Sequence, residues 1–387
     1  MSRRYHRGVV RYTLLPRGSL MSITKIVVTG GPCGGKTSAL SRIQTDLSHL
    51  GYTVLVVPET ATALISGGVA PWTCGSNEEY QKCQMKMQLQ KERIFEQAAA
   101  TMDSDKVLIV CDRGELDNRA YMTGEEFAHV LDYLGMTEAE LRDGYDAVFH
   151  MVTAASGAEK FYTLENNGAR YETLEQAREL DNRFIEAWTG HPYLRVIDNR
   201  SDFEGKLRHL IREITYFLGE LEPFEIERKF LIRYPDVSWL ESLPNCQKVP
   251  IVQYYLRSEP DQEIRIRQRG VSGEAVFTFT EKAIEGTHKH LVRQRRLTER
   301  EFEMLLLQAD PKMREISKTR YCLTYEGQYF EIDLFPCWDD QAIAEIELSS
   351  KDVPVTFPPE LEVIREVTGD PKYRNAVIAS KPRGATH

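Results

Sequence analysis

The sequence predicts an α/β domain, with a parallel sheet and helices on both faces, followed by an α+β domain built on an antiparallel β-barrel. The first prediction rests on apolar strand-like runs that alternate with longer amphipathic stretches from Met21 to Gly219. The second rests on a change after Leu221 to short runs in which charged and apolar residues alternate. A chain of 387 residues is long enough for two domains that each bury a core.

We divide the chain into an extension (1–20), the α/β domain (21–219) and the barrel domain (222–387). The extension is rich in arginine and lacks the apolar run of a secretory signal. Its origin stays open between a cloning remnant, an upstream start and a native basic tail. Because the join between the domains is short, we expect no flexible linker.

Composition excludes several classes of protein. The formal net charge of −9 at pH 7 predicts no general binding to nucleic acid, so any anion site must be local. No stretch approaches the ~18 apolar residues that a transmembrane helix needs. The seven cysteines are scattered without a CxxC pair, which argues against a disulfide framework and a structural zinc site. We therefore expect a cytoplasmic protein in a reducing compartment.

Apolar runs and the amphipathic stretches between them define the elements of the parallel sheet. The strands are expected at 25–30, 53–59, 107–113, 146–152 and 194–199. The helices are expected near 36–50, 77–102, 124–134, 172–189 and 202–219. This order of strand and helix is typical of a sheet whose crossover connections are helical.

The residues between the first strand and the first helix read GGPCGGKT, which matches GxxxxGKT. The glycines let successive backbone amides approach phosphate oxygens at a helix N-terminus. In this pattern the lysine reaches the β- and γ-phosphates and the threonine hydroxyl binds magnesium. The sequence thus predicts a P-loop of the NTPase type, with a nucleotide site made by Gly30, Gly31, Pro32, Cys33, Gly34, Gly35, Lys36, Thr37 and Ser38.

Charged residues follow the second and third strands of the predicted sheet. Open parallel sheets bind ligands at the carboxyl ends of their strands, which places Glu59 beside the P-loop. We expect Glu59 to accept a proton from an attacking hydroxyl or to orient a water; its alternative role is to start the next helix. Asp112 is expected to hold magnesium and Arg113 to reach a phosphate. Asp117 is a weaker candidate that could simply cap a helix.

Two later polar segments add candidates. Arg170 and Arg178 follow the fourth strand, where loops can close over a triphosphate and bring arginines to the charge that develops during transfer. Their alternative role is that of solvated helix residues. Asp198 and Asn199 follow the fifth strand, near the place expected for a purine base. The chain has no NKxD sequence, so both ATP and GTP remain candidates.

Three features look like the small-molecule kinase branch of P-loop NTPases. They are the strand at 53–59, which ends in Val-Pro-Glu, the pair Asp112 and Arg113, and the segment that contains Arg170 and Arg178. The segments GAEKFYT, NNGARYE and AWTGHP…VIDN are similar to the AAA-type ATPase domain of ribosylnicotinamide-kinase-like proteins and of the translocation-defect family known from fly photoreceptors. The match covers about residues 23–218. The resemblance implies magnesium-dependent nucleotide binding and leaves the phosphate acceptor open.

Charged residues alternate with apolar ones along several segments of the second domain. Side chains two residues apart point to the same face of a strand. Acidic pairs on some strands and basic pairs on others therefore suggest a closed sheet with a polar interior. Buried charges are costly unless a partner or ligand neutralises them, so this interior is expected to hold a polyphosphate and a divalent metal. The alternative is a salt-bridged barrel without a ligand.

This pattern resembles the CYTH family of triphosphate tunnel metalloenzymes, which includes thiamine triphosphatases and class IV adenylate cyclases. The resemblance covers about residues 222–380 and begins at an ExExK motif. It implies a metal held by Glu225, Glu227, Asp333, Glu345 and Glu347. It implies an anion bound by Lys229, Arg265, Arg267, Lys282, Lys318 and Arg320, with Asn375 matching near the end, and we add Arg293 and Arg295 as anion candidates. One strand departs, because Arg293, Arg295 and Arg296 stand where family members often carry arginine followed by glutamate.

Two functions follow from these observations. The first is a Mg²⁺-dependent, purine nucleotide-binding NTPase or small-molecule kinase, whose barrel binds or hydrolyses a triphosphate or polyphosphate with Mg²⁺ or Mn²⁺. Its partners are ATP or GTP and a phosphorylated small molecule or polyphosphate. The translocation-defect resemblance implies the second: a non-catalytic, GTP- or ATP-dependent regulator whose barrel binds phospholipid headgroups such as phosphatidic acid or phosphoinositides. That protein would associate peripherally with anionic membranes.

Overall fold

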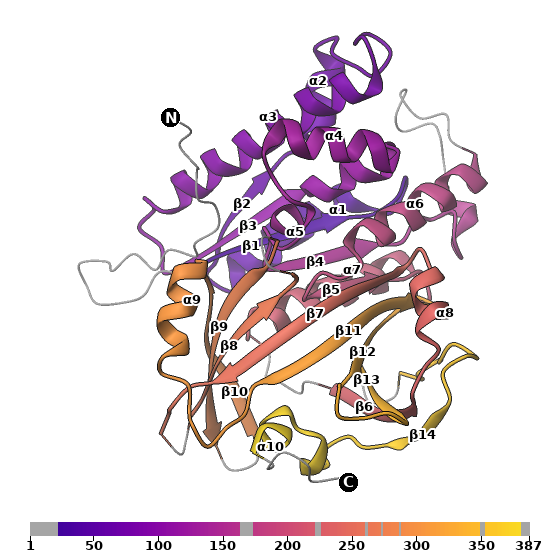
Figure 1. The fold of residues 1–387 in the computed structure, drawn as a ribbon. Coiled ribbons are helices and arrows are strands. Elements are labelled where there is room, and N and C mark those ends of the chain that lie inside the picture. Colours follow the sequence, from indigo (N-terminus) through magenta and orange to yellow (C-terminus); the bar gives the residue numbers. More distant parts are fainter. Residues whose placement is uncertain are drawn as a thin grey trace. The chain divides into compact units, whose positions relative to one another are not determined.

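The computed structural model describes residues 22–162, 173–220, 226–259, 262–271, 274–285, 288–348 and 353–380 (Figure 1). Contacts divide the chain into two compact units with the boundary between Glu222 and Pro223. Within the described ranges, no helix is long and apolar enough to cross a membrane.

A five-stranded parallel sheet in the order β2-β3-β1-β4-β5 forms the centre of the N-terminal unit. Its strands are β1 (Ser22–Thr29), β2 (Thr53–Val57), β3 (Lys106–Asp112), β4 (Ala147–Met151) and β5 (Leu194–Ile197). The prediction of an α/β fold with a parallel sheet is confirmed. Since β1 lies between β3 and β4, the loop after β1 is flanked by the carboxyl ends of both neighbours: Val28 pairs with Asp112, and Thr29 with His150.

Helices cover both faces of this sheet (Figure 1). They are α1 (Lys36–His49), α2 (Thr60–Ser66), α3 (Asn77–Ala99), α4 (Gly124–Leu134), α5 (Glu138–Arg142), α6 (Leu174–Trp188) and α7 (Phe203–Phe217), with 3₁₀ turns η1 (Glu115–Tyr121) and η2 (Glu159–Phe161). Alternate strand residues such as Val28 and Leu108 pack with α1 and α7 in one core, which sets the position of the α1 N-terminus. On the other side, Trp188 of α6 and Val27 of β1 both lie beside Gly114.

A nine-stranded antiparallel sheet, in the order β10-β9-β8-β7-β11-β12-β13-β6-β14, forms the C-terminal unit. Its strands are β6 (Ile226–Arg233), β7 (Cys246–Tyr255), β8 (Gln262–Arg269), β9 (Val276–Glu285), β10 (His288–Leu297), β11 (Ile316–Tyr325), β12 (Gln328–Leu334), β13 (Gln341–Leu348) and β14 (Val363–Glu366). The helical segments are α8 (Val237–Ser242), α9 (Glu299–Leu306), η3 (Pro371–Tyr373) and α10 (Asn375–Ser380). The predicted antiparallel sheet is confirmed.

The two faces of this sheet differ because residues alternate along each strand. On one face, which we name the outer face, apolar residues such as Ile232 and Phe330 pack with α8, and Ile266 packs with Phe302 of α9. The opposite face, named the inner face, carries most of the charged pairs identified in the sequence. Two smaller apolar clusters, one around Ile343 and one around Val249, belong to this inner face. The charged side chains therefore lie between apolar neighbours and are largely shielded from water.

Candidate functional site

The loop of residues 30–35 connects β1 to α1 and passes close to β4. Gly30 has a φ of 139°, and a Cβ at this position would lie 2.0 Å from the Met151 carbonyl oxygen. Gly35, at a φ of 91°, directly precedes α1. Any side chain at position 30 would collide with the backbone of β4, so only glycine fits there. This glycine lets the loop lie against β4 before α1 begins at Lys36.

Lys36 is the first residue of α1, and its ammonium group donates to the Gly30 carbonyl oxygen at 3.1 Å. Burial and the positive charge of Arg113 lower the pKa of Lys36 to about 8. A phosphate placed at this ammonium would favour its charged form. Thr37 and Ser38, on the same helical turn, keep their hydroxyl-bearing side chains exposed.

Three residues predicted from the sequence meet beside the P-loop. Asp112 ends β3, and Arg113 follows it in a left-handed conformation with a φ of 70°. The Arg113 Nε donates to Glu59 Oε1 at 2.7 Å, and its guanidinium lies 4.6 Å from the centre of the Phe184 ring. Burial alone would raise the pKa of Glu59, but Arg113 and its other partners hold it at about 2. Glu59 is therefore a stable carboxylate fixed by an arginine.

Two buried polar atoms in this cluster have no hydrogen-bond partner among the described residues: Asp112 Oδ1 and Arg113 Nη1. Buried polar groups are nearly always paired, so an unpaired acceptor next to an unpaired cationic donor indicates a ligand site. A magnesium–nucleotide complex offers a cation to the carboxylate and phosphate oxygens to the guanidinium. Asp112 and the exposed Thr37 hydroxyl are both oxygen donors of the kind that Mg²⁺ prefers, so these residues fit the metal.

A buried aspartate on α6 holds the P-loop from the other side. Asp181 Oδ1 accepts a hydrogen bond from the Gly31 amide at 2.6 Å, and His150 Nε2 lies 3.1 Å from the same oxygen. Burial would raise the pKa of Asp181, but His150 and the Gly31 amide lower it. Sequence reasoning missed this residue, because Asp181 is one of several charged residues on an amphipathic helix and no motif marks it.

Asp117 braces the start of the P-loop. Its Oδ1 accepts hydrogen bonds from Thr29 Oγ1 at 2.6 Å and from Trp188 Nε1 at 2.8 Å. Its Oδ2 accepts from the Gly114 amide at 2.9 Å, which begins η1. The side chain is buried and fully used by these donors. The capping role that the sequence allowed for Asp117 therefore describes it better than a ligand-binding role.

The predicted arginines after β4 are described in part. Arg178 lies on α6, where its Nε donates to the Ala155 carbonyl oxygen at 2.6 Å and its Nη2 pairs with Glu159 at 3.0 Å. These bonds fix the loop that follows β4, next to the P-loop. Arg170 lies outside the described residues.

The two polar residues after β5 also hold this loop. The Asn199 amide donates to the carbonyl oxygens of Thr153 at 2.8 Å and Ser156 at 2.7 Å. Asp198 accepts from the backbone amide of Arg200 at 3.0 Å and pairs with its guanidinium. The contact of either residue with a purine base stays a prediction.

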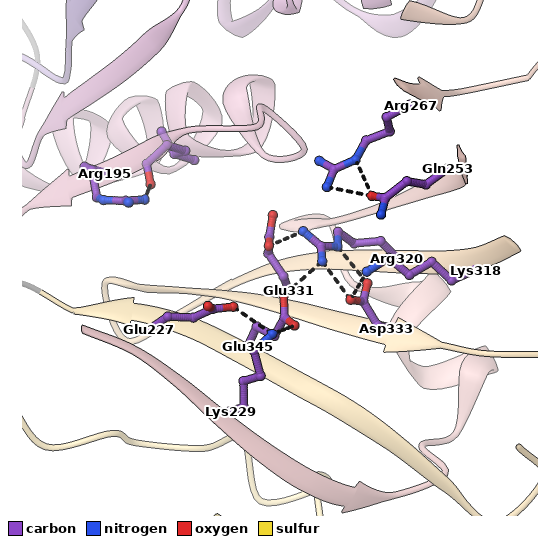
Figure 2. A network of polar contacts seen from close by, with 11 residues as sticks. Arg195, Glu227, Lys229, Gln253, Arg267, Lys318, Arg320, Glu331, Asp333 and Glu345 are labelled. Carbon is purple, nitrogen blue, oxygen red and sulfur yellow. Dashed lines mark hydrogen bonds and ion pairs between the residues drawn. The ribbon is translucent and has the colours of Figure 1, made fainter. Parts of the chain in front are cut away.

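The inner face of the C-terminal sheet carries a connected network of charges (Figure 2). Arg320 on β11 binds Asp333 through two hydrogen bonds of 2.7 Å and reaches Glu345 at 3.0 Å. It also pairs with Glu331, and Lys318 pairs with Asp333. Arg320 thus neutralises carboxylates on β12 and β13 at the same time.

Lys229 on β6 completes this network from the other side of β13. Its ammonium lies 2.6 Å from Glu345 and 3.1 Å from Glu227. Burial alone would lower the pKa of Lys229, but these two carboxylates raise it. Lys229 and Arg320 in turn lower the pKa of Glu345 against the effect of its burial. The carboxylates are therefore charged and held by bases.

The arginines of β8 are in a different situation. Arg267 donates to Gln253 Oε1 through Nε at 3.3 Å and Nη2 at 3.2 Å, and the buried Nε of Arg265 has no hydrogen-bond partner among the described residues. Burial lowers the pKa of Arg267, and the charges of Arg265, Arg320 and Arg269 lower it further. In the part of the chain that the structure describes, neither Arg265 nor Arg267 pairs with a carboxylate. An anion would neutralise both.

The structure does not bring all of the predicted residues to this network. Arg295 points to the outer face, where it lies 5.7 Å from the centre of the Phe279 ring and binds Glu301 at 3.0 Å. Lys282 stands opposite Glu263 on β8. Glu225 and the Arg293 side chain lie outside the described residues.

The remaining predicted residues lie near the ends of strands. Glu347 stands opposite Glu227, with both on the inner face, and Asn375 begins α10. Among the residues that the structure describes, no group of three or more His, Cys, Asp or Glu side chains is placed to hold a metal ion. In this arrangement three of the acidic residues predicted as metal ligands, Glu227, Asp333 and Glu345, serve as ion-pair partners.

The P-loop, the strand-end Asp-Arg pair and the parallel sheet define the N-terminal unit as a P-loop domain. Residues 25–206 match the family model described as an AAA domain. The N-terminal unit is therefore a P-loop AAA domain, and it is followed by a C-terminal domain that is structurally similar to the solved protein NE1496. No curated protein matches the chain.

Three solved structures illustrate this similarity. One, titled the inorganic triphosphatase NE1496, is 30% identical, covers 42% of this chain and 98% of its own, and has a TM-score of 0.30. A second structure, titled the hypothetical protein NE1496, has the same identity, covers 41% and 98%, and has a TM-score of 0.28. PH1819 from Pyrococcus Horikoshii OT3 is 15% identical, covers 32% of this chain and 80% of its own, and has a TM-score of 0.24.

Proposed function

We propose that the N-terminal domain binds a magnesium complex of ATP or GTP and transfers the terminal phosphoryl group to water or to a small molecule. The observation that supports this most is the buried pair of unpaired atoms, Asp112 Oδ1 and Arg113 Nη1, beside Lys36. In water such atoms would be solvated, and in a protein interior they need partners, which a ligand that carries both charges supplies.

The roles of the residues follow from their surroundings. Lys36 and Arg113 bind phosphate oxygens and stabilise the charge that develops on the transferred group. Asp112 and Thr37 would hold the metal, which would neutralise part of the negative charge of the phosphates. Glu59, with a pKa of about 2, accepts a proton poorly. We therefore assign Glu59 to orienting Arg113, with which it pairs at 2.7 Å, and the attacking hydroxyl or water.

Phosphate release tests this proposal. The full-length protein with Mg²⁺ and ATP or GTP should release phosphate, and Lys36→Ala should abolish the release. Arg42→Gln is the matched control, because Arg42 lies on the same helix and pairs at the surface with Asp46 and Glu204. If Lys36→Ala keeps the wild-type rate, the site is misassigned. If the protein binds nucleotide without turnover, the regulatory function is favoured over the enzyme.

We further propose that the C-terminal domain binds a polyphosphate on its inner face. Arg265 and Arg267, which are half-buried and have no carboxylate partner among the described residues, carry this proposal. Polyphosphate suits them because guanidinium groups bind phosphate oxygens in two-point contacts. A headgroup in a membrane is the less suitable ligand, since these side chains lie on a shielded face.

Calorimetric titration with tripolyphosphate tests the second site. The double variant Arg265→Gln with Arg267→Gln should weaken binding by at least tenfold. Arg228→Gln should bind like the wild type, since Arg228 pairs with Glu366 at 2.6 Å on the outer face. Phosphate release from tripolyphosphate, compared between wild type and Glu227→Gln, then shows whether the site also hydrolyses its ligand. Binding to phosphatidic acid vesicles without binding to tripolyphosphate would contradict the proposal.

A further inference from the structure

Three buried polar side chains of α3 lie close to the pair formed by Glu59 and Arg113. They are Tyr80, Gln81 and Gln84, with exposed fractions of 3%, 2% and 7%. Each has a side-chain oxygen without a hydrogen-bond partner among the described residues: the Tyr80 hydroxyl, Gln81 Oε1 and Gln84 Oε1. Buried polar atoms are nearly always paired, so three unpaired atoms on neighbouring turns of one helix indicate a place where a ligand binds.

The contacts of α3 place these side chains beside the strand-end cluster of the N-terminal domain. Gln88, one turn after Gln84, donates from Nε2 to the carbonyl oxygen of Arg113 at 3.5 Å. Burial and the charge of Glu59 raise the pKa of the Tyr80 hydroxyl to about 12, so Tyr80 lies within reach of that carboxylate. The unpaired oxygens thus lie next to the residues that we assign to phosphoryl transfer.

The orientation of the Gln84 side chain follows from its neighbours. The Asn118 amide donates to Gln88 Oε1 at 3.2 Å and to the Glu115 carbonyl oxygen at 2.9 Å. Asn118 Oδ1 is therefore left as an acceptor, and Gln84 Nε2 donates to it at 2.6 Å. An amide group that gives its nitrogen to one partner turns its oxygen away from that partner. The Gln84 carbonyl oxygen is thus held away from Asn118 and can accept from a ligand.

The unpaired atoms define the chemistry of this ligand. Amide carbonyl oxygens accept hydrogen bonds, and a phenol hydroxyl donates and accepts them. A molecule with several hydroxyl groups supplies these partners. A molecule with a phosphate of its own is less suitable, because burying a charge without a counter-charge is costly. The cations described next to these atoms are already engaged: Arg113 pairs with Glu59, and Lys91 donates to the Pro58 carbonyl oxygen.

We propose that Tyr80, Gln81 and Gln84 bind the molecule that receives the phosphoryl group, and that this molecule is an uncharged compound with several hydroxyl groups, such as a sugar or a polyol. The inference rests on the proposed function of the N-terminal domain and names its acceptor. An acceptor hydroxyl oxygen bonds to the γ-phosphorus, the bond from that phosphorus to the β-phosphate oxygen breaks, and the nucleoside diphosphate leaves with the electron pair. The hydroxyl proton passes to water.

The segment 67–76, which connects α2 to α3, is the side from which this acceptor enters. Cys74 of the segment is close enough to Tyr80 to act on the pKa of its hydroxyl. The bonds described for the Thr73 hydroxyl stay within the segment, and the Trp72 side chain is 74% exposed. Movement of the segment would therefore uncover the first turns of α3.

The first test needs no ligand. A polar atom that stays unpaired until a ligand binds lowers the stability of the free protein, so its removal should raise the melting temperature. Tyr80→Phe removes only the unpaired hydroxyl and should melt about 2–4 °C above the wild type. Tyr145→Phe is the matched control and should melt below the wild type, because its hydroxyl donates to Glu92 at 2.8 Å and accepts from the Glu115 amide at 2.9 Å.

This comparison decides whether the Tyr80 hydroxyl is used in the free protein. A Tyr80→Phe protein that melts no higher than the wild type overturns the inference, because the hydroxyl would then be paired without a ligand. A rise for Tyr80→Phe together with a fall for Tyr145→Phe supports it.

The second test measures transfer of the radioactive γ-phosphate of ATP or GTP by the full-length protein. The probes are ribose, glucose, glycerol and myo-inositol, each compared with its own monophosphate. A neutral probe should accept phosphate at least tenfold faster than its monophosphate. Transfer to the monophosphates alone overturns the inference, and so does phosphate release to water without transfer to any probe. If the nucleotide is neither hydrolysed nor used in transfer, the proposed function itself fails.

Variants then assign the accepted probe to α3. Tyr80→Phe combined with Gln81→Met should raise the KM for the neutral probe at least tenfold and leave the KM for the nucleotide within twofold. Lys82→Gln is the control on the same turn and should leave both values unchanged, since Lys82 pairs with Glu78 and Glu79. An unchanged KM for the probe in the double variant overturns the inference. If the double variant does not fold, Tyr80→Phe alone is judged by the same criterion.

Discussion

Nucleotide affinity should depend on pH through Lys36. In the free protein, burial and Arg113 lower the pKa of this ammonium to about 8. Only the charged form attracts phosphate oxygens, and a bound triphosphate restores the charge. Affinity for the magnesium complex of ATP should therefore fall as the pH rises above 8, although ATP itself keeps the same charge over that range.

The size of the effect follows from the pKa. If Lys36 is always charged in the complex, the dissociation constant increases with the neutral fraction of Lys36 in the free protein. For a pKa of about 8, the constant rises roughly 25-fold between pH 7.5 and pH 9.5, which is about 1.9 kcal/mol. The stability of the free protein moves in the opposite direction. The charged form is disfavoured in the folded state, so this destabilisation disappears as the pH rises from about 8 to the ordinary value of 10.5.

Calorimetry from pH 7.5 to pH 9.5 measures the effect, and Lys36→Arg is the control. A guanidinium stays charged over this range, so the variant should give a flat profile whatever its absolute affinity. Thermal melts of the free protein at each pH exclude unfolding as the cause. A flat wild-type profile, or a variant profile as steep as that of the wild type, would refute the reasoning.

Three further predictions concern the N-terminal domain. Gly30→Ala should abolish nucleotide binding and lower the free energy of unfolding more than Gly51→Ala does. Gly51 also has a positive φ but open space around it, so its substitution should cost only the ~1–2 kcal/mol of left-handed strain. Equal losses in urea unfolding would contradict the close packing of the P-loop. Asp117→Asn should cost about 1–3 kcal/mol in the same assay, because an amide group cannot accept from all three donors. The Glu59–Arg113 ion pair stabilises the folded protein above the ordinary carboxyl pKa of 4.5, and this stabilisation is lost as the pH falls toward 2. The difference in free energy of unfolding between wild type and Glu59→Gln should therefore disappear over that range. A difference that persists at pH 2 would rule out the ion pair as its source.

Local signals were sufficient to predict the fold. Each strand of the parallel sheet is a continuous apolar run, and the P-loop lies between one such run and an amphipathic helix. In the second domain, alternation of charged and apolar residues predicts which side chains share a face, and the structure places Lys318, Arg320 and Asp333 together as alternation requires. These features depend on neighbours within a few positions of the chain.

Features that depend on register or on distant contacts were not predictable. Arg293 and Arg295 were assigned to the anion site as a pair, but the register of β10 shifts between Leu291 and Arg293. Arg295 consequently pairs with Phe279 of the outer face, and Arg296 stands opposite Thr278 of the inner face. One extra residue in a strand moves all of the following side chains to the opposite face of the sheet, and the sequence pattern does not indicate where such a residue lies.

The two candidate sites differ in how many segments of the chain contribute their binding groups. A P-loop binds phosphate through consecutive backbone amides, and here those amides belong to one short loop between β1 and α1 that Asp117 and Asp181 hold in place. The inner-face network consists of side chains from β6, β11, β12 and β13, and several of them contact more than one oppositely charged group. A backbone cradle has one arrangement, whereas a network of ion pairs has alternatives of similar energy. Arg320, with three carboxylates in contact, is therefore the residue on which the inner-face network depends most.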